Sequence, residues 1–257
     1  MRIRNLLNSI DEIIPQYLAC DFDNVGLILG DNDKQVNKIM IALDATAYVV
    51  AQAIEKKVDL LITHHPIIFS SLKKINDESI IGRKIISLIK NDISCIAVHT
   101  NFDRVFMAKN LSDKLEINVL DYVGSYEDKK ELALGIIGEV QESLLVDLAE
   151  KIKKSFSLEY VDIIGNKNSY VEKVCVIPGS GRSLINEAIK KGANTIITAD
   201  ITHHTAVDLF EDNINVISMT HFDMENIMKE KLKNILLNIN KDFEIFIADE
   251  NCPYERV

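Results

Sequence analysis

Six His, Asp and Glu residues stand in three short groups whose spacing suits metal ligands. In chain order they are His64 with His65, His99 with Asp103, and His221 with Glu225. Together they form a mixed nitrogen and oxygen set, which suits Zn, Mn, Fe or Ni better than Ca or Mg alone. A carboxylate can also bridge two ions about 3.5–4 Å apart, as in two-metal hydrolytic sites. The groups therefore predict metal binding and permit hydrolysis by an activated water.

Each group taken alone also has an ordinary structural interpretation. Adjacent histidines are common on surfaces and in cores, Asp103 could cap the helix that follows it, and a His–Glu pair at i, i+4 is a common helix pair. The combination favours metal binding because each group directly follows an apolar, strand-like run. In open α/β sheets, ligands bind beyond the carboxyl ends of the strands, where the fold can bring these groups together.

Two further polar segments follow predicted strands. Asp200 precedes His203 and His204, and this segment predicts either a helix that starts near Thr202 or side chains that support the site and move protons. The GSGRS turn at 179–183 opens a predicted helix, where backbone N–H groups attract an anion, but a bare Gly-Ser turn is weak evidence and a simple tight turn is the favoured interpretation. The turn lacks the lysine of a P-loop, so a Walker-type nucleotide site is not supported.

An alternation of strands and helices positions these groups. In the first part of the chain, apolar spacing predicts helices at 3–18, 46–57 and 78–90, and strands at 38–43, 58–62 and 94–98. The second part continues with strands at 132–140, 158–164, 172–177, 194–198, 214–218 and 243–248, and helices at 142–155, 182–191 and 224–238. This order is typical of an α/β layered fold with a largely parallel sheet.

The polar stretch 124–131 is the best internal boundary, which predicts two halves at 1–125 and 126–257. The halves resemble each other. Residues 53–63 align without a gap to 188–198, the strand end 41–44 falls against 176–179, and the TNFD sequence at 100–103 recurs as THFD at 220–223. Ordered recurrence favours an internal duplication over chance similarity of two Ile-rich strands. Two related halves could face each other and share one metal site.

Composition excludes several classes of protein. The net charge of −10 opposes standing contact with duplex DNA or an anionic membrane, and acidic residues at 11 and 12 interrupt any signal peptide. No run approaches the roughly 20 apolar residues of a membrane span. The four cysteines are widely spaced without a CxxC motif, which predicts reduced thiols in a cytoplasmic protein.

The motifs also resemble those of one known family in type and order. The matching segments are DFDNVGLILG at 21–30, DLLITHHPIIF at 59–69, HTNFD at 99–103, GSG at 179–181, the TAD…H segment at 198–204 and H-x-x-x-E at 221–225. On these segments the chain resembles, over nearly its whole length, the dinuclear metal-centre proteins called GTP cyclohydrolase 1 type 2 homologues, or the Nif-three-like family. The resemblance implies two intertwined, duplicated α/β halves with mixed sheets in three αβα layers.

The resemblance also implies a set of site residues. His64 and Asp103 would bind one divalent ion, His65 and His221 would bind a second, and Glu225 would bridge both. Three further residues would line the site as catalytic or supporting groups: His99, Asp200 and His204.

Members of the family form homohexameric rings, built as trimers of dimers. This chain departs from the pattern at RVFMAKN (104–110), where the family usually has a Gly-rich loop, and it lacks the large central insertion of some members.

Two functions of different class remain open. One is a metal-dependent hydrolase of the GTP cyclohydrolase 1 type 2 kind, acting on GTP, another nucleotide or a phosphoester. The other is a ring-shaped protein that binds metal without turnover, as a scaffold or metallochaperone. Nucleic-acid binding would need a basic lining, which the acidic composition disfavours.

Overall fold

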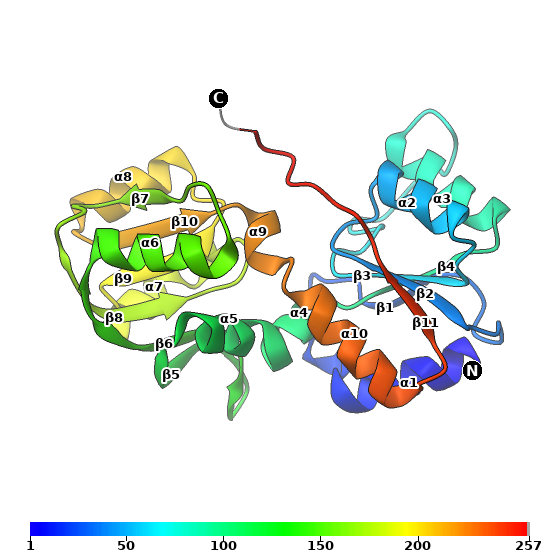
Figure 1. Cartoon of the computed structure of the whole chain (residues 1–257), viewed down its shortest axis with the longest axis horizontal. Helices are drawn as coiled ribbons and strands as arrows, with labels where there is room; N and C mark the ends of the chain where they lie inside the picture. The colour runs from blue at the N-terminus through cyan, green and yellow to red at the C-terminus, as the bar shows by residue number, and fades with distance from the viewer. Residues whose placement is uncertain (256–257) are drawn as a thin grey trace. The chain divides into compact units, whose positions relative to one another are not determined.

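Apolar strands of Ile, Leu and Val form the centres of two sheets in the computed structural model, which describes residues 1–255 of the chain. Contacts within the chain divide it into two units (Figure 1). The first unit comprises Met1–Phe102 and Met228–Asn251, and the second comprises Asp103–Ile227 with the segment that begins at Cys252. The first unit is thus built from both ends of the chain, with most of the second unit inserted between them.

The first unit holds a five-stranded sheet in the order β1-β4-β3-β2-β11. Its strands are β1 (Gly26–Leu29), β2 (Lys38–Ala42), β3 (Leu60–Thr63), β4 (Ser94–Ala97) and β11 (Glu244–Ile247). Four strands are parallel, and β1 joins the edge antiparallel to β4. The sheet is therefore mixed but largely parallel.

Helices cover both faces of this sheet. On one face α2 (Ala47–Glu55) and α3 (Ile80–Lys90) share an apolar core with the strands. On the other face lie α1 (Ile3–Ile13), a 3-10 turn at Gln16–Leu18, and α10 (Met228–Ile239). Thr46 and Ser79 accept hydrogen bonds from backbone N–H groups in the first turns of α2 and α3, which explains where these helices begin.

The second unit holds a six-stranded mixed sheet in the order β5-β6-β8-β9-β10-β7. Its strands are β5 (Asn118–Tyr126), β6 (Lys129–Leu144), β7 (Asp162–Ile164), β8 (Tyr170–Val176), β9 (Thr195–Ala199) and β10 (Asn215–Met219). β8, β9 and β10 are parallel, and the remaining pairs are antiparallel.

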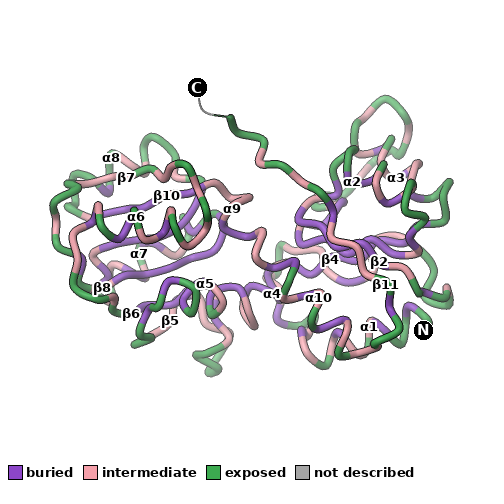
Figure 2. Tube along the Cα trace, in the orientation of Figure 1, coloured by how far each residue is buried: buried purple, intermediate pink, exposed green. Residues whose placement is uncertain are grey.

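Helices again cover both faces. One face carries a 3-10 turn at Gly181–Ser183, α7 (Ile185–Lys190) and α8 (His203–Glu211) over a core that includes Cys175 and Ile196. The other carries α5 (Ala108–Leu115) and α6 (Leu145–Phe156). Both units thus have the three-layer αβα architecture that the resemblance implies, and Figure 2 shows their central strands as buried.

The duplication predicted from the sequence is visible in the topology. In the first unit β2, α2 and β3 form a parallel pair with its crossover helix, and β4 lies beside β3; β8, α7, β9 and β10 repeat this arrangement in the second. The two T-x-F-D sequences follow the third strand of each set. They begin α4 (Thr100–Phe102) in the first unit and α9 (His221–Glu225) in the second.

The division of the chain differs from the expected halves 1–125 and 126–257, whose last two residues lie outside the described part. The polar stretch 124–131 contains the tight turn between β5 and β6, which pair along one sheet. The units instead divide at residues 102/103, 227/228 and 251/252. A hairpin turn and a domain boundary have the same polar composition, which is why the sequence pattern does not separate them.

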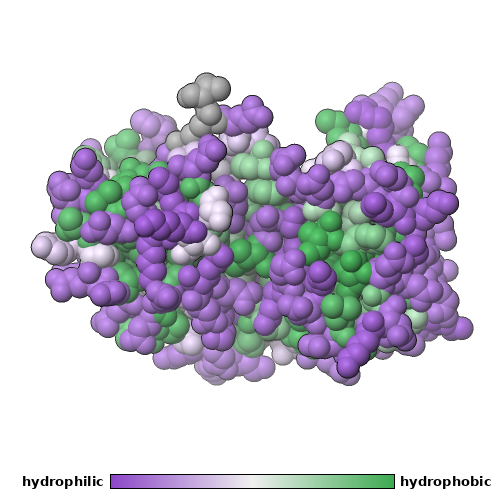
Figure 3. All heavy atoms as spheres, viewed as in Figure 1, coloured by the Kyte–Doolittle hydropathy of each residue, from purple (hydrophilic) through white to green (hydrophobic). Residues whose placement is uncertain are grey.

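The surface also agrees with the charged composition of the chain. On the face shown in Figure 3, most side chains are hydrophilic and the hydrophobic ones gather in small groups. Among residues 1–255, no helix has the length and apolar character needed to cross a membrane.

Candidate metal centre

Three histidines of the first unit meet at the carboxyl ends of two neighbouring parallel strands. His64 and His65 follow β3, and His99 comes two residues after the end of β4, which pairs with β3 in register. One nitrogen from each imidazole lies within 4.8 Å of the others. The ring centroids are 5.0 to 5.4 Å apart. The predicted convergence of these imidazoles is therefore present within this unit.

A hydrogen bond fixes the ring orientation of each of these histidines. Nδ1 of His64 lies 2.8 Å from the backbone oxygen of Val98. Because a carbonyl oxygen only accepts, Nδ1 carries the proton, and Nε2 is the nitrogen that can bind a cation. His65 Nδ1 faces Asp44 Oδ1 at 2.9 Å, and His99 Nδ1 faces an Asp23 oxygen at 2.8 Å. Partners of this kind orient imidazole ligands in metal sites.

Asp23 is held as a carboxylate. Its side chain accepts hydrogen bonds from His99 and from both the backbone N–H and the hydroxyl of Thr100, at 3.1 and 2.5 Å for Thr100. Burial would raise the pKa of Asp23, but the hydrogen bonds and the charge of His99 outweigh it and lower this pKa to about 2. An ionised Asp23 is a hydrogen-bond acceptor, so it orients the His99 ring through Nδ1.

The acceptor of His65 is positioned by the far end of the chain. Asp44 follows β2, and the backbone N–H groups of Leu43 and Asp44 donate to the two carboxylate oxygens of Glu250, at 2.8 and 3.0 Å. The side chain of Glu250 is 4% exposed and also contacts Lys229 at 3.1 Å. The position of Asp44 therefore depends on Glu250, which lies 206 residues later in the chain.

The second unit contributes a compact His–Glu pair. Thr220 caps α9 by accepting from the N–H of Asp223, and the helix places His221 and Glu225 on one face, as their spacing predicts. His221 Nδ1 lies 2.6 Å from Asp200, and its Nε2 lies 2.8 Å from a Glu225 oxygen. If Nδ1–H donates to Asp200, two acceptors face each other at Nε2 and Glu225. A proton or a metal ion between them reconciles this contact.

A glycine makes room for that pair. Gly179 has φ +55°, and a Cβ atom at this position would lie 2.3 Å from Glu225 Oε1 and 3.1 Å from His221 Cε1. The N–H of Gly181 donates to the hydroxyl of Thr198 at 3.0 Å, and this hydroxyl donates to the Gly179 carbonyl at 2.9 Å. The GSG segment is thus a tight turn held against β9, and this N–H already has an acceptor.

Asp103 is buried and belongs to a helix rather than to a cap or a loop. Thr100–Phe102 begins the helix, Asp103–Met107 forms a π-helical turn, and α5 continues from Ala108. The RVFMAKN segment is accordingly helical. Phe102, the residue bonded to Asp103, places its ring 6.1 Å from that of His64. A π-helical turn inside an α-helix often marks a functional site.

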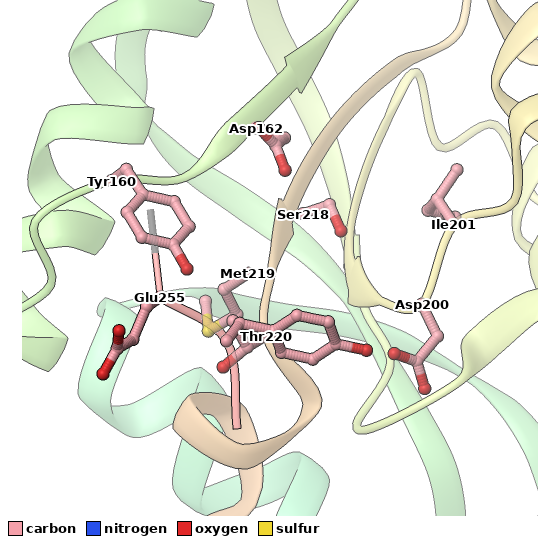
Figure 4. A pocket seen from close by; sticks show the side chains of 9 residues that line it. Tyr160, Asp162, Asp200, Ile201, Ser218, Met219, Thr220 and Glu255 are labelled. Carbon is pink, nitrogen blue, oxygen red and sulfur yellow. The ribbon is translucent and has the colours of Figure 1, made fainter. Parts of the chain in front are cut away.

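Asp200 also lines a cavity of about 440 Å³ within the second unit (Figure 4). The cavity lies at the carboxyl ends of β9 and β10, where α/β sheets bind ligands. Tyr160, Thr220 and Tyr254 are among its lining residues. Asp200 has φ +53°, an uncommon conformation for a residue other than glycine. The same residue therefore holds His221 and faces a space that could admit a small molecule.

His204 makes no contact with the other predicted site residues of the second unit that are described above. It is exposed at the start of α8, beside His203, and Thr202 caps this helix. Within residues 1–255, His204 has no hydrogen bond to Asp200 or His221. Its catalytic role stays a prediction. Sequence reasoning missed Asp23 and Asp44, although the position of Asp44 at the carboxyl end of a predicted strand was a usable signal.

The chain is similar to known proteins over its full length. The model of the family described as Duf34/NIF3 (NGG1p interacting factor 3) matches residues 1–253. The GTP cyclohydrolase 1 type 2 homolog of Clostridium acetobutylicum is 34% identical over 267 residues, covering 99% of this chain and 98% of that protein. The homolog of the same name from Clostridium perfringens is 34% identical over 263 residues, covering 99% of both.

Among solved structures, the hypothetical protein SA1388 of Staphylococcus aureus matches with a TM-score of 0.91 and 28% identity. The match covers 100% of this chain and 99% of that one.

Proposed function

Because the chain belongs to the Duf34/NIF3 family, whose model spans residues 1–253, we propose that it binds two divalent metal ions and hydrolyses a small substrate beside them. The observation that carries this proposal is the orientation of four imidazoles. In His64, His65, His99 and His221, Nδ1 faces an oxygen acceptor, so that each Nε2 is the ligand atom. Four histidines set in this way are far more typical of a metal site than of a core.

We assign the ligands as the family resemblance implies. His64 and Asp103 bind one ion, His65 and His221 bind the other, and Glu225 bridges them. Two features of the chain support this assignment: Asp103 is bonded to Phe102, whose ring contacts that of His64, and Glu225 already contacts Nε2 of His221. Neutral imidazoles and carboxylates suit Zn, Fe, Mn or Ni, and cellular supply as well as ligand type decides which of them is bound.

The proposed reaction is attack by water on a nucleotide or a related small molecule. Two bound ions would lower the pKa of water and polarise the bond under attack. His99 would orient the substrate, with Asp23 keeping its Nδ1 proton in place. Asp200 would hold His221, and His204 would move protons at the rim of the site. The names of the two Clostridium relatives point to GTP as the first substrate to test.

A second candidate function is metal binding without turnover, as in a scaffold or metallochaperone. One observation favours it: the side chain of His64 is fully buried and Glu225 is 3% exposed, so these ligands leave little open surface for a substrate. Catalytic metal sites keep an open position for water or substrate, whereas structural sites are closed.

Elemental analysis and a turnover screen separate the two candidates. We expect close to two divalent ions per chain after purification or reconstitution, and hydrolysis of GTP, another nucleotide or a phosphoester. His64→Ala and Asp103→Ala should each abolish turnover. His203→Ala, which removes an exposed imidazole outside the assigned ligands, is the matched control and should retain it. Bound metal with no turnover supports the second candidate. A chain that binds no metal even on addition contradicts both.

Two further properties are proposed with this function. We expect a homohexameric ring built as a trimer of dimers, as the family resemblance implies, and sedimentation of the purified chain tests it. We place the protein in the cytoplasm because its four cysteines are widely spaced and form no CxxC motif. The acidic composition disfavours nucleic acid as a partner.

A further inference from the structure

Two phenylalanines of the first unit lie exposed side by side next to the three-histidine group. Phe22 is 65% exposed and Phe69 is 51% exposed. Their ring centroids are 6.2 Å apart with the planes tilted by 55°. Single exposed apolar residues are ordinary, but a contacting pair of large exposed rings on one surface calls for an explanation.

Both rings stand on segments that hydrogen bonds hold in place. Asn24 donates from its side chain to the backbone oxygen of Ile68 at 2.6 Å, which ties the segment of Phe22 to that of Phe69. The N–H of Cys20 donates to the Thr100 hydroxyl at 2.9 Å. The backbone on both sides of Phe22 is therefore held in place beside the segment of Phe69.

The aromatic pair borders the candidate metal centre. The ring of Phe69 is 6.3 Å from that of His99, edge to face at 76°. Asp23, the neighbour of Phe22, accepts the hydrogen bond from His99. A molecule bound on these rings would therefore lie against His99, one of the three converging imidazoles.

The exposed area indicates a small occupant. Two half-exposed phenylalanine rings present on the order of 200–250 Å². A stable protein interface buries about 800 Å² on each partner. The pair offers two flat apolar faces at an angle, on which a planar ring can stack against one face and meet the edge of the other.

We propose that Phe22 and Phe69 bind the planar heteroaromatic ring of a purine nucleotide and determine specificity for it. This proposal rests on the hydrolytic function above and assigns the residues that recognise the base of its substrate. The phosphates of such a ligand gain nothing from two phenyl rings, so the rings act on the base alone.

Binding of guanosine, GTP and inorganic triphosphate to the metal-loaded full chain tests the proposal by calorimetry. Phe22→Ala and Phe69→Ala should each weaken guanosine and GTP binding by roughly 5- to 150-fold, the range expected for one lost stacking contact. Triphosphate binding should stay unchanged. Phe210→Ala removes a phenylalanine that is 61% exposed on α8, and this matched control should bind all three ligands normally.

A conservative variant adds an independent signal. The chain has no tryptophan, so Phe22→Trp introduces a single tryptophan at the pair, which can be excited at wavelengths where the tyrosines do not absorb. It should retain guanosine binding, and guanosine should quench its emission while triphosphate should not.

Unchanged guanosine binding in both alanine variants overturns the proposal. Equal weakening of triphosphate binding also overturns it. A change in oligomeric state without a change in guanosine binding would instead assign the pair to a contact between copies of the chain, and overturns the proposal as well. A wild-type protein that holds two ions but binds no purine also overturns it, and leaves metal binding intact. Absence of bound metal instead contradicts the proposed function, and stacking at Phe22 can still be measured by fluorescence.

Discussion

The two units share a strand order but carry different chemistry at the same strand ends. The 135-residue offset that aligns 53–63 with 188–198 places His65 opposite Asp200 and Asp44 opposite Gly179. In the first unit, imidazoles follow β3 and carboxylates accept from them. In the second, the residue after β9 is itself the carboxylate, and the imidazole comes from the helix after β10. The duplicated frame thus preserves where polar groups stand, while each unit carries a different set of candidate ligands.

The contrast between Asp44 and Gly179 shows how this difference arises. In the first unit, the strand end after β2 can carry a side chain, and Asp44 uses it to hold His65. In the second unit, the matching position lies against Glu225 and His221, and no Cβ fits there. The second unit instead places the helix carboxylate of Glu225 beside this strand end, and Asp200 holds His221.

The largest expected effect is at Glu225. Because the proposal makes its carboxylate the bridge between two ions, Glu225→Gln should lower metal affinity by more than about 100-fold, beyond the 10- to 100-fold typical of groups that only orient a ligand. His99→Ala should retain more metal than Glu225→Gln. Metal titration followed by elemental analysis measures both variants. Equal metal content in the two variants would remove the bridging role.

The paired positions Asp44 and Gly179 give the next effect. Asp44→Ala should lower metal affinity by roughly 10- to 100-fold, because His65 loses the acceptor that orients it. Gly179→Ala should displace Glu225 and destabilise the fold by about 1–3 kcal/mol, since φ +55° is unfavourable for alanine. Chemical denaturation with and without metal measures both. Gly192→Ala is the matched control, because Gly192 also has a positive φ, of +87°, and a Cβ there would make only ordinary contacts with the Lys173 side chain; it adds backbone strain without displacing a candidate ligand.

Acid should act on the first unit through Asp23. Its pKa is lowered to about 2 in the folded chain from 3.8, so its contribution to stability is present above pH 3.8 and is lost as the pH falls through about 2. We expect about 1–2 kcal/mol, less than the full value of the shift because the pair is partly solvated. Asp23→Asn should lower the metal-free stability at pH 6 and flatten its change between pH 4 and 2.

Denaturation of the metal-free protein at several pH values measures the effect of Asp23. Asp128→Asn, in the turn between β5 and β6, is the control and should leave the profile unchanged. If the stability of Asp23→Asn changes with pH in the same way as that of the wild type, this carboxylate contributes nothing to the pH dependence of stability.

The smallest effect concerns the buried cysteine that each unit carries in its core. Burial raises the pKa of the thiols of Cys95 and Cys175 to about 12, so both remain protonated near neutral pH. At pH 8 we expect iodoacetamide to modify neither in the folded chain, while the partly exposed Cys252 reacts. Both should react after unfolding, which mass spectrometry of peptides detects. Selective reaction of one of the two in the native state would show that the cores are unequally stable.

Local sequence patterns predict much of this fold and less of the site. The strands β2, β3 and β4 are short apolar runs between polar turns, and they are found nearly residue by residue. The pattern does not predict β5, because this strand is half exposed and is interrupted by Asp121 and Gly124. It does not predict α5, because the eight residues of this helix are largely polar. Spacing identifies the His–Glu pair of α9 because its two members lie on one helix.

The acceptors of the histidines are harder to predict. Asp23 reaches His99 across 76 residues, and Asp44 reaches His65 across 21. No local period relates such partners, because only the pairing of strands brings them together. A sequence pattern therefore finds candidate ligands more readily than the groups that orient them.

Glu250 has a consequence for how the protein is made. It accepts hydrogen bonds from the backbone N–H groups of Leu43 and Asp44, and β11 pairs with β2 across 206 residues, so the first unit cannot reach its final form until residue 250 has been synthesised. Most of the second unit, by contrast, is one continuous segment that can fold as it emerges. The histidines of the first unit are therefore translated early but oriented late. On the ribosome, His65 gains its oriented ring only after Glu250 has been synthesised and has bound the backbone at Asp44.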